Sequence, residues 1–149
     1  LTIFTKSIFL CYTSNMDKYK ENLIIEYLTK EFAAILIMLF GSAVTNKTHA
    51  DSDIDIAFIS ETKHNNMQIY NATQDLAHLL KKEVDLIDLT AVSPVMQAKI
   101  ITKGRIIYDE NPEFRQNFFI LALKKYTRLN EEREVVIKKI KERGTVYGR

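Results

Sequence analysis

The feature that most constrains this chain is an apolar run that ends in Gly41-Ser42 and is followed, ten residues later, by Asp53-Ile54-Asp55. Residues 35–40 (Ile-Leu-Ile-Met-Leu-Phe) are apolar and have the length of a buried strand. If residues 53–60 form a second strand, the period of two places both aspartates on one face, roughly 6.5–7 Å apart at Cα. The alternating isoleucines would point to the other face. The pattern therefore predicts two buried strands that meet at an acidic corner.

The aspartates and the Gly-Ser corner offer complementary chemistry. Neighbouring carboxylates repel each other unless a cation lies between them. Mg²⁺ prefers oxygen ligands and is bound through one or two carboxylates plus substrate phosphates. Gly41 offers backbone without a Cβ atom, and Ser42 offers a hydroxyl and nearby N–H groups, which suit a phosphate. We therefore predict a site for a metal-bound nucleoside triphosphate.

A calcium-binding loop is the first alternative, because Asp51, Asp53 and Asp55 have the spacing that begins such a loop. That loop needs glycine at its sixth position and glutamate at its twelfth, where this chain has Ile56 and Thr62. A solvated acidic turn is the second alternative. The alternating apolar residues and the Gly-Ser pair at a fixed distance argue against it.

The spacing resembles the signature of the nucleotidyltransferase superfamily that includes DNA polymerase β, and most of all its minimal nucleotidyltransferase (MNT) proteins. The similarity runs from about residue 19 to residue 109, through residues 84–89, Ser93-Pro94 and residues 104–108. It implies an α+β fold: a small mixed β-sheet of about four strands, helices packed on it and a long C-terminal helix. It also implies that Asp85 is the third carboxylate. Asp88 would face the other side of the same strand.

The resemblance assigns roles to particular residues. It implies that Asp53, Asp55 and Asp85 are catalytic and bind Mg²⁺, in a two-metal site, with ATP as the substrate. Gly41 and Ser42 would bind the nucleotide. Many relatives carry an Ala-Arg-Gly sequence shortly after the serine, where this chain has Ala43-Val44-Thr45-Asn46. Of the basic residues between the two halves of the motif, Lys47 is our candidate for a nucleotide-binding role.

The rest of the chain predicts a single domain of alternating elements. We expect helices over residues 17–33, 66–82, 94–103 and 111–144, and strands over residues 35–40, 53–60, 84–89 and 105–108. In the second helix, apolar spacing predicts a buried stripe that includes Leu76, Leu79 and Leu80. We divide the chain into a peripheral extension (1–15), a nucleotidyltransferase core (16–110) and a C-terminal helical tail (111–149). That tail is long enough to break or to run past the core.

The composition of the chain indicates its cellular compartment and the kinds of partner that it can bind. The single cysteine, Cys11, allows no internal disulfide and fits a reducing cytoplasm. No apolar run approaches the ~20 residues of a membrane span. The net charge of +2 gives no argument for direct nucleic-acid binding, although residues 124–149 hold nine Lys/Arg against four Asp/Glu. A basic helical tail can be a solvated face, which is the commonest outcome, a protein-binding surface or a weak attractor of phosphate, so we use it only as a pointer to a partner. The terminal helix could also pair with itself.

MNT proteins are typically antitoxins paired with a HEPN-domain ribonuclease toxin. The resemblance therefore implies that this chain transfers AMP from ATP to a hydroxyl, a tyrosine of a cognate HEPN toxin. Only 40 residues follow Asp109, which is a short segment from which to build the walls of a small-molecule pocket. Two alternatives stay open: an antitoxin that acts by binding alone, and a nucleotidyltransferase that modifies an aminoglycoside-like small molecule.

Overall fold

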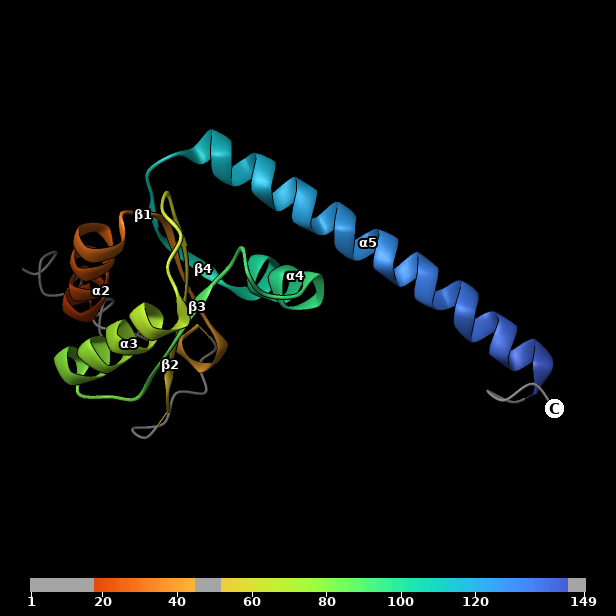
Figure 1. The fold of residues 1–149 in the computed structure, drawn as a ribbon, viewed down its shortest axis with the longest axis horizontal. Helices are drawn as coiled ribbons and strands as arrows, with labels where there is room; N and C mark the ends of the chain where they lie inside the picture. Colours follow the sequence, from red (N-terminus) through yellow and green to blue (C-terminus); the bar gives the residue numbers. More distant parts are fainter. Residues whose placement is uncertain (1–17, 45–51, 145–149) are drawn as a thin grey trace, which may run out of the picture.

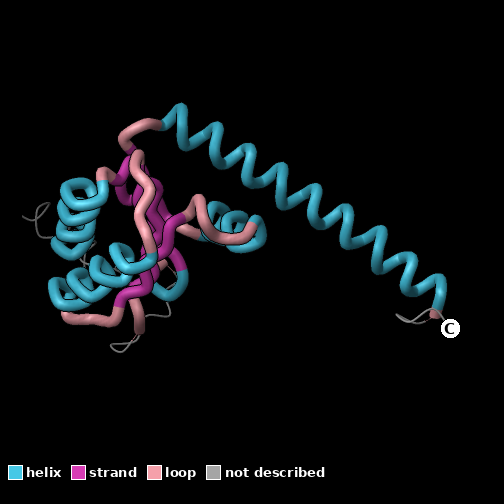
Figure 2. The backbone as a smooth tube through the Cα atoms, in the orientation of Figure 1, coloured by secondary structure: helices cyan, strands magenta, loops and turns pink. Residues whose placement is uncertain are grey.

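A computed structural model describes residues 18–44 and 52–144 of the chain. Its centre is one sheet, drawn in magenta in Figure 2. The strands are β1 (Ala34–Phe40), β2 (Ile54–Ser60), β3 (Val84–Asp88) and β4 (Arg105–Asp109), and their order in the sheet is β3-β2-β1-β4. Strand β1 pairs antiparallel with both β2 and β4, whereas β2 pairs parallel with β3. The mixed four-stranded sheet confirms the predicted fold class.

Helices cover both faces of the sheet (Figure 1). Helices α2 (Lys18–Phe32) and α3 (Asn66–Leu80) pack on one face, and α4 (Pro94–Lys103) packs on the other. Each face has its own apolar cluster, because the side chains of β2 alternate. Ile54, Ile56 and Phe58 belong to the cluster with α2 and α3, while Ala57 and Ile59 belong to the cluster with α4. We call these the α2–α3 face and the α4 face.

Local sequence explains where the helices begin. The Asn65 side chain accepts a hydrogen bond from the backbone N–H of Gln68, and the Gln68 side chain accepts one from Asn65, which is a capping box. The Ser93 hydroxyl accepts from the backbone N–H of Met96, with Pro94 at the first helical position. The predicted start of α4 at Pro94 is confirmed.

The last helix, α5 (Pro112–Arg143), runs well past the core as one unbroken element (Figure 1). Its 32 residues span about 48 Å at 1.5 Å per residue. The first half packs against α4, and Ala122 is buried there. Residues 131–139 are all exposed. Of the two predicted outcomes, running past the core is the one observed.

Some details differ from the sequence-based expectations. Strand β2 begins at Ile54, so Asp53 lies immediately before the strand and not in it. Helix α3 ends at Leu80, because Lys81 has a left-handed backbone with φ of 54°. Leu79 was expected in the buried stripe, but it is 45% exposed. The residues that α3 buries are Ala72, Leu76 and Leu80, a row with a strict spacing of four.

Among the helices in the described ranges, none combines the length and hydrophobicity that crossing a bilayer requires. The expected N-terminal extension, residues 1–15, lies outside the described residues, and so does Lys47.

Candidate active site

Gly41 stands directly after β1, at the point where the chain turns away from the sheet. Its φ of +66° is in the left-handed region that favours glycine. A Cβ atom built at this position would lie 2.1 Å from Oδ2 of Asp55. The carboxylate of Asp55 therefore rests against the bare backbone of the corner. Both the backbone conformation and the space demand glycine here.

Ser42 joins the corner to the other aspartate of the motif. Its hydroxyl donates a hydrogen bond to the backbone carbonyl of Asp53, at 3.3 Å. The N–H of Val44 donates to the carbonyl of Gly41, at 3.2 Å, and closes a short 3-10 turn over residues 41–43. The two halves of the motif, ten residues apart in sequence, are thus in direct contact.

Asp85 is brought beside Asp55 by the pairing of two strands. In the parallel register of β2 and β3, Asp55 and Asp85 are direct partners. Both lie on the α4 face, because their neighbours Ile56 and Leu86 belong to the α2–α3 cluster. Asp53 and Asp85 are exposed, and Asp55 is half-buried. Three carboxylates therefore gather at one end of the sheet, next to the Gly-Ser corner.

Asp88, the other acid of β3, has a structural role. Its Oδ1 accepts hydrogen bonds from the Thr90 backbone N–H at 2.9 Å and the Thr90 hydroxyl at 2.7 Å. These bonds hold the turn that follows the strand.

Burial and the two neighbouring acids perturb Asp55. Burial raises the pKa of Asp55 above its ordinary value, and the negative charges of Asp85 and Asp53 raise this pKa further. The positive charge of Lys99 on α4 acts in the opposite direction. Within the described residues, no hydrogen bond reaches the Asp55 carboxylate. A half-buried carboxylate with this surplus of negative charge is a natural ligand for a cation.

The donor set fits a hard divalent cation. Carboxylate oxygens are the ligands that Mg²⁺ prefers. Within residues 18–44 and 52–144, no three acidic, histidine or cysteine side chains converge closely enough to enclose a metal on their own. Such enclosure is not required, because Mg²⁺ keeps few protein ligands and completes its shell with water and substrate phosphates. The open arrangement therefore suits a metal that arrives with a nucleotide.

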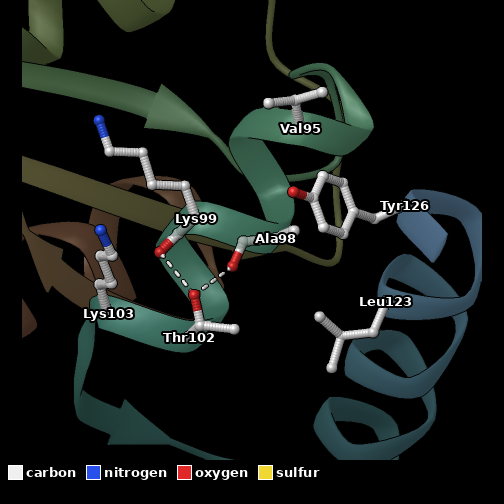
Figure 3. Close-up of a pocket in the computed structure, with 7 residues that line it drawn as sticks. All are labelled: Val95, Ala98, Lys99, Thr102, Lys103, Leu123 and Tyr126. Atoms are coloured by element: carbon white, nitrogen blue, oxygen red, sulfur yellow. Dashed lines mark hydrogen bonds between the residues drawn. The ribbon is translucent and has the colours of Figure 1, made fainter. Parts of the chain in front are cut away.

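Lys99 is a charged residue whose influence on the acids the sequence analysis missed. Figure 3 shows it on α4 at the edge of a pocket between α4 and α5, with a volume of about 320 Å³. The lining consists of Val95, Ala98, Lys99, Thr102, Lys103, Leu123 and Tyr126. A pair of lysines four residues apart is visible in the sequence, but it looks like ordinary charge at a helix C-terminus. Only the packing of α4 on the sheet relates Lys99 to the acids.

A sequence model described as "Polymerase beta, Nucleotidyltransferase" matches residues 22–113, more than half of the chain. The chain belongs to this nucleotidyltransferase family. The match spans the Gly-Ser corner and all three aspartates, so the residues that meet in the structure all lie inside the family's domain.

Individual relatives of this nucleotidyltransferase have been characterised. The protein adenylyltransferase MntA of Shewanella oneidensis is 32% identical over 123 residues, 82% of this chain and 88% of MntA. A crystal structure of a toxin–antitoxin with AMP-PNP contains a chain with a TM-score of 0.74 and 31% identity, covering 80% of this chain and 97% of that one. A structure of tri-AMPylated Shewanella oneidensis HEPN toxin with an MNT antitoxin matches with a TM-score of 0.70 and 29% identity, covering 84% and 98%.

Proposed function

We propose that this nucleotidyltransferase transfers AMP from ATP to a tyrosine hydroxyl of a cognate HEPN-domain toxin, and so acts as an antitoxin. The observation that carries the proposal is the contact between Asp55 and the backbone of Gly41, with Asp85 as the strand partner of Asp55. Carboxylates, which are ligands that Mg²⁺ prefers, therefore lie beside a corner suited to phosphate, and this supports the proposal. The relatives support the acceptor, since one is an adenylyltransferase and another is bound to an AMPylated toxin.

In this proposal the residues of the acidic site and of the Gly-Ser corner have different roles. Gly41 and Ser42 receive the triphosphate, and Asp53, Asp55 and Asp85 hold Mg²⁺. When bound, Mg²⁺ offsets the negative charge of the phosphates and of the transition state. The acceptor oxygen forms a bond to the α-phosphorus, and the bond from that phosphorus to the bridging oxygen of the β-phosphate breaks. Asp85 accepts the proton of the attacking hydroxyl, and pyrophosphate leaves.

The shape of the molecule favours a protein acceptor. Asp53 and Asp85 are exposed, so two of the three acids face open solvent and not a closed chamber. A small-molecule site usually encloses most of its ligand. The exposed part of α5 offers a large additional surface to a protein partner. The use of ATP supports a cytoplasmic location as part of this proposal.

The test is AMP transfer to the protein encoded by the neighbouring gene, which the proposal expects to be the cognate HEPN toxin. With α-labelled ATP and Mg²⁺, the wild type should label that protein, and a chelator should abolish labelling. The double variant Asp53→Ala, Asp55→Ala should lose labelling. Asp88→Asn is the matched control: it removes a charge from β3 but keeps Oδ1 as the acceptor for Thr90.

Two results would replace the proposal. A toxin that stays unlabelled but is still neutralised by the double variant would indicate an antitoxin that acts by binding alone. Pyrophosphate release that depends on an aminoglycoside-like compound, and not on the toxin, would indicate a small-molecule nucleotidyltransferase.

A further inference from the structure

Helix α4 leads from the far end of the sheet to the end that carries the acids. Near its start, the side-chain amide of Gln97 donates a hydrogen bond to the carbonyl of Leu89, just after β3, at 2.8 Å. At its end, Gly104 packs against β1: a Cβ atom added there would lie 3.1 Å from the carbonyl oxygen of Leu39. Leu39 is two residues before Gly41. The last turns of α4 therefore lie close to the Gly-Ser corner.

Two lysines occupy these last turns. Lys99 and Lys103 are four residues apart and so lie on the same side of the helix. Figure 3 shows both side chains extending away from Leu123 and Tyr126, which belong to α5. Both lysines are exposed. Neither takes part in the three ion pairs that the described residues form.

The site has a surplus of negative charge, which cations such as these lysines would offset. Three carboxylates lie at this end of the sheet, and a bound nucleotide would add the charge of its phosphates. The last turns of α4, which carry Lys99, lie at the same end of the sheet as these carboxylates. A lysine ammonium on a flexible stem is a common ligand for terminal phosphates.

We propose that Lys99, assisted by Lys103, binds the β- and γ-phosphates of the nucleotide and the pyrophosphate that leaves. This inference rests on the proposed function of the acidic site as a nucleotide site. Between Gly41 and Asp53, the sequence has only Lys47 and His49 as basic residues. The inference adds the lysines of α4 as a second source of positive charge for the phosphates. The competing explanation is purely structural: lysines near a helix C-terminus stabilise the helix dipole.

The two explanations predict different changes in ligand affinity when the positive charge of Lys99 is removed. We would measure binding of AMP-PNP and of AMP, each with Mg²⁺, to the full-length wild type and to Lys99→Met, Lys103→Met and Lys99→Arg. One lost charge-assisted contact should weaken AMP-PNP roughly 10- to 100-fold in Lys99→Met. AMP, which lacks the β- and γ-phosphates, should bind almost unchanged. Lys103→Met should have a smaller effect, and Lys99→Arg should restore most of the affinity.

The matched control is Lys30→Met. Lys30 is an exposed lysine in the last turn of α2, on the other face of the sheet, so its loss removes a helix-dipole contact without reaching the acids. In the labelling assay, Lys99→Met should raise the KM for ATP and weaken product inhibition by pyrophosphate, while the KM for the toxin stays the same.

The inference is overturned if Lys99→Met binds AMP-PNP like the wild type, or if it loses AMP-PNP and AMP equally. It is also overturned if Lys30→Met shows the same loss. Tight AMP-PNP binding that depends on Lys99, without any toxin labelling, would support the phosphate role and refute only the proposed acceptor. A wild type that binds no AMP-PNP would refute the proposed function together with the inference.

Discussion

Replacing Asp55 by asparagine should stabilise the folded protein while it abolishes AMP transfer. In the register of β2 and β3, Asp55 is the direct partner of Asp85, and neighbouring strands are about 4.8 Å apart. Two carboxylates about 6 Å apart repel each other by roughly 0.7–3 kcal/mol for effective dielectric constants between 80 and 20. Because Asp85 is exposed, solvent screening favours the lower end, about 1 kcal/mol. Asparagine has almost the same shape without the charge.

The sign of the pH dependence follows from the raised pKa of Asp55. The unfolded value is about 3.9. A raised folded pKa means that the folded state binds the proton more tightly, so the ionised form is destabilising at neutral pH. The wild type regains this lost stability as the pH falls through the folded pKa of Asp55, because the carboxylate becomes protonated. The advantage of Asp55→Asn should therefore be largest near pH 8 and should shrink in acid.

Thermal unfolding in a chelating buffer measures the effect. A gain of about 1 kcal/mol corresponds to a rise in Tm of roughly 2–4 °C for a chain of this size. Asp88→Asn, which removes a hydrogen-bonded charge from the other acid of β3, should not raise the Tm. Adding Mg²⁺ with AMP-PNP should stabilise the wild type more than Asp55→Asn. A Tm for Asp55→Asn at or below that of the wild type at pH 8 would refute the view that this site holds unrelieved repulsion.

Three further changes test other parts of the structure. Gly41→Ala should lose most activity and about 1–2 kcal/mol of stability, because its backbone is left-handed and its Cβ would displace the Asp55 carboxylate; normal activity and Tm would contradict the described corner. Arg105→Met should cost about 1–3 kcal/mol in urea unfolding, because it leaves the buried Glu21 without its ion-pair partner; an unchanged midpoint would contradict this. Truncation after Asn130 should remove helical circular dichroism but shift the Tm little, since residues 131–139 are exposed; a large loss of stability would show that the distal α5 supports the core.

Much of the fold could be predicted because local patterns determine it. Alternation along residues 54–59 predicted a strand with two different faces. The helices predicted to start at residues 94 and 111 begin within one residue of these positions, where Ser93 and Asn111 cap them. The misjudged Leu79 shows the limit of this reasoning. The spacing of apolar residues is compatible with more than one buried row on a helix, and the surface that the helix packs on selects the row.

The sequence by itself determined that a glycine–serine corner and a pair of aspartates at alternate positions stand at the ends of two buried strands, because these features depend only on the period of a strand and on short spacings. The tertiary structure alone decided that Asp85 lies beside Asp55, since this depends on the parallel register between strands about thirty residues apart in sequence. It also decided that α4 crosses the same face and brings Lys99 toward these acids. These arrangements depend on packing between segments that are distant in sequence, which no local pattern of residues encodes.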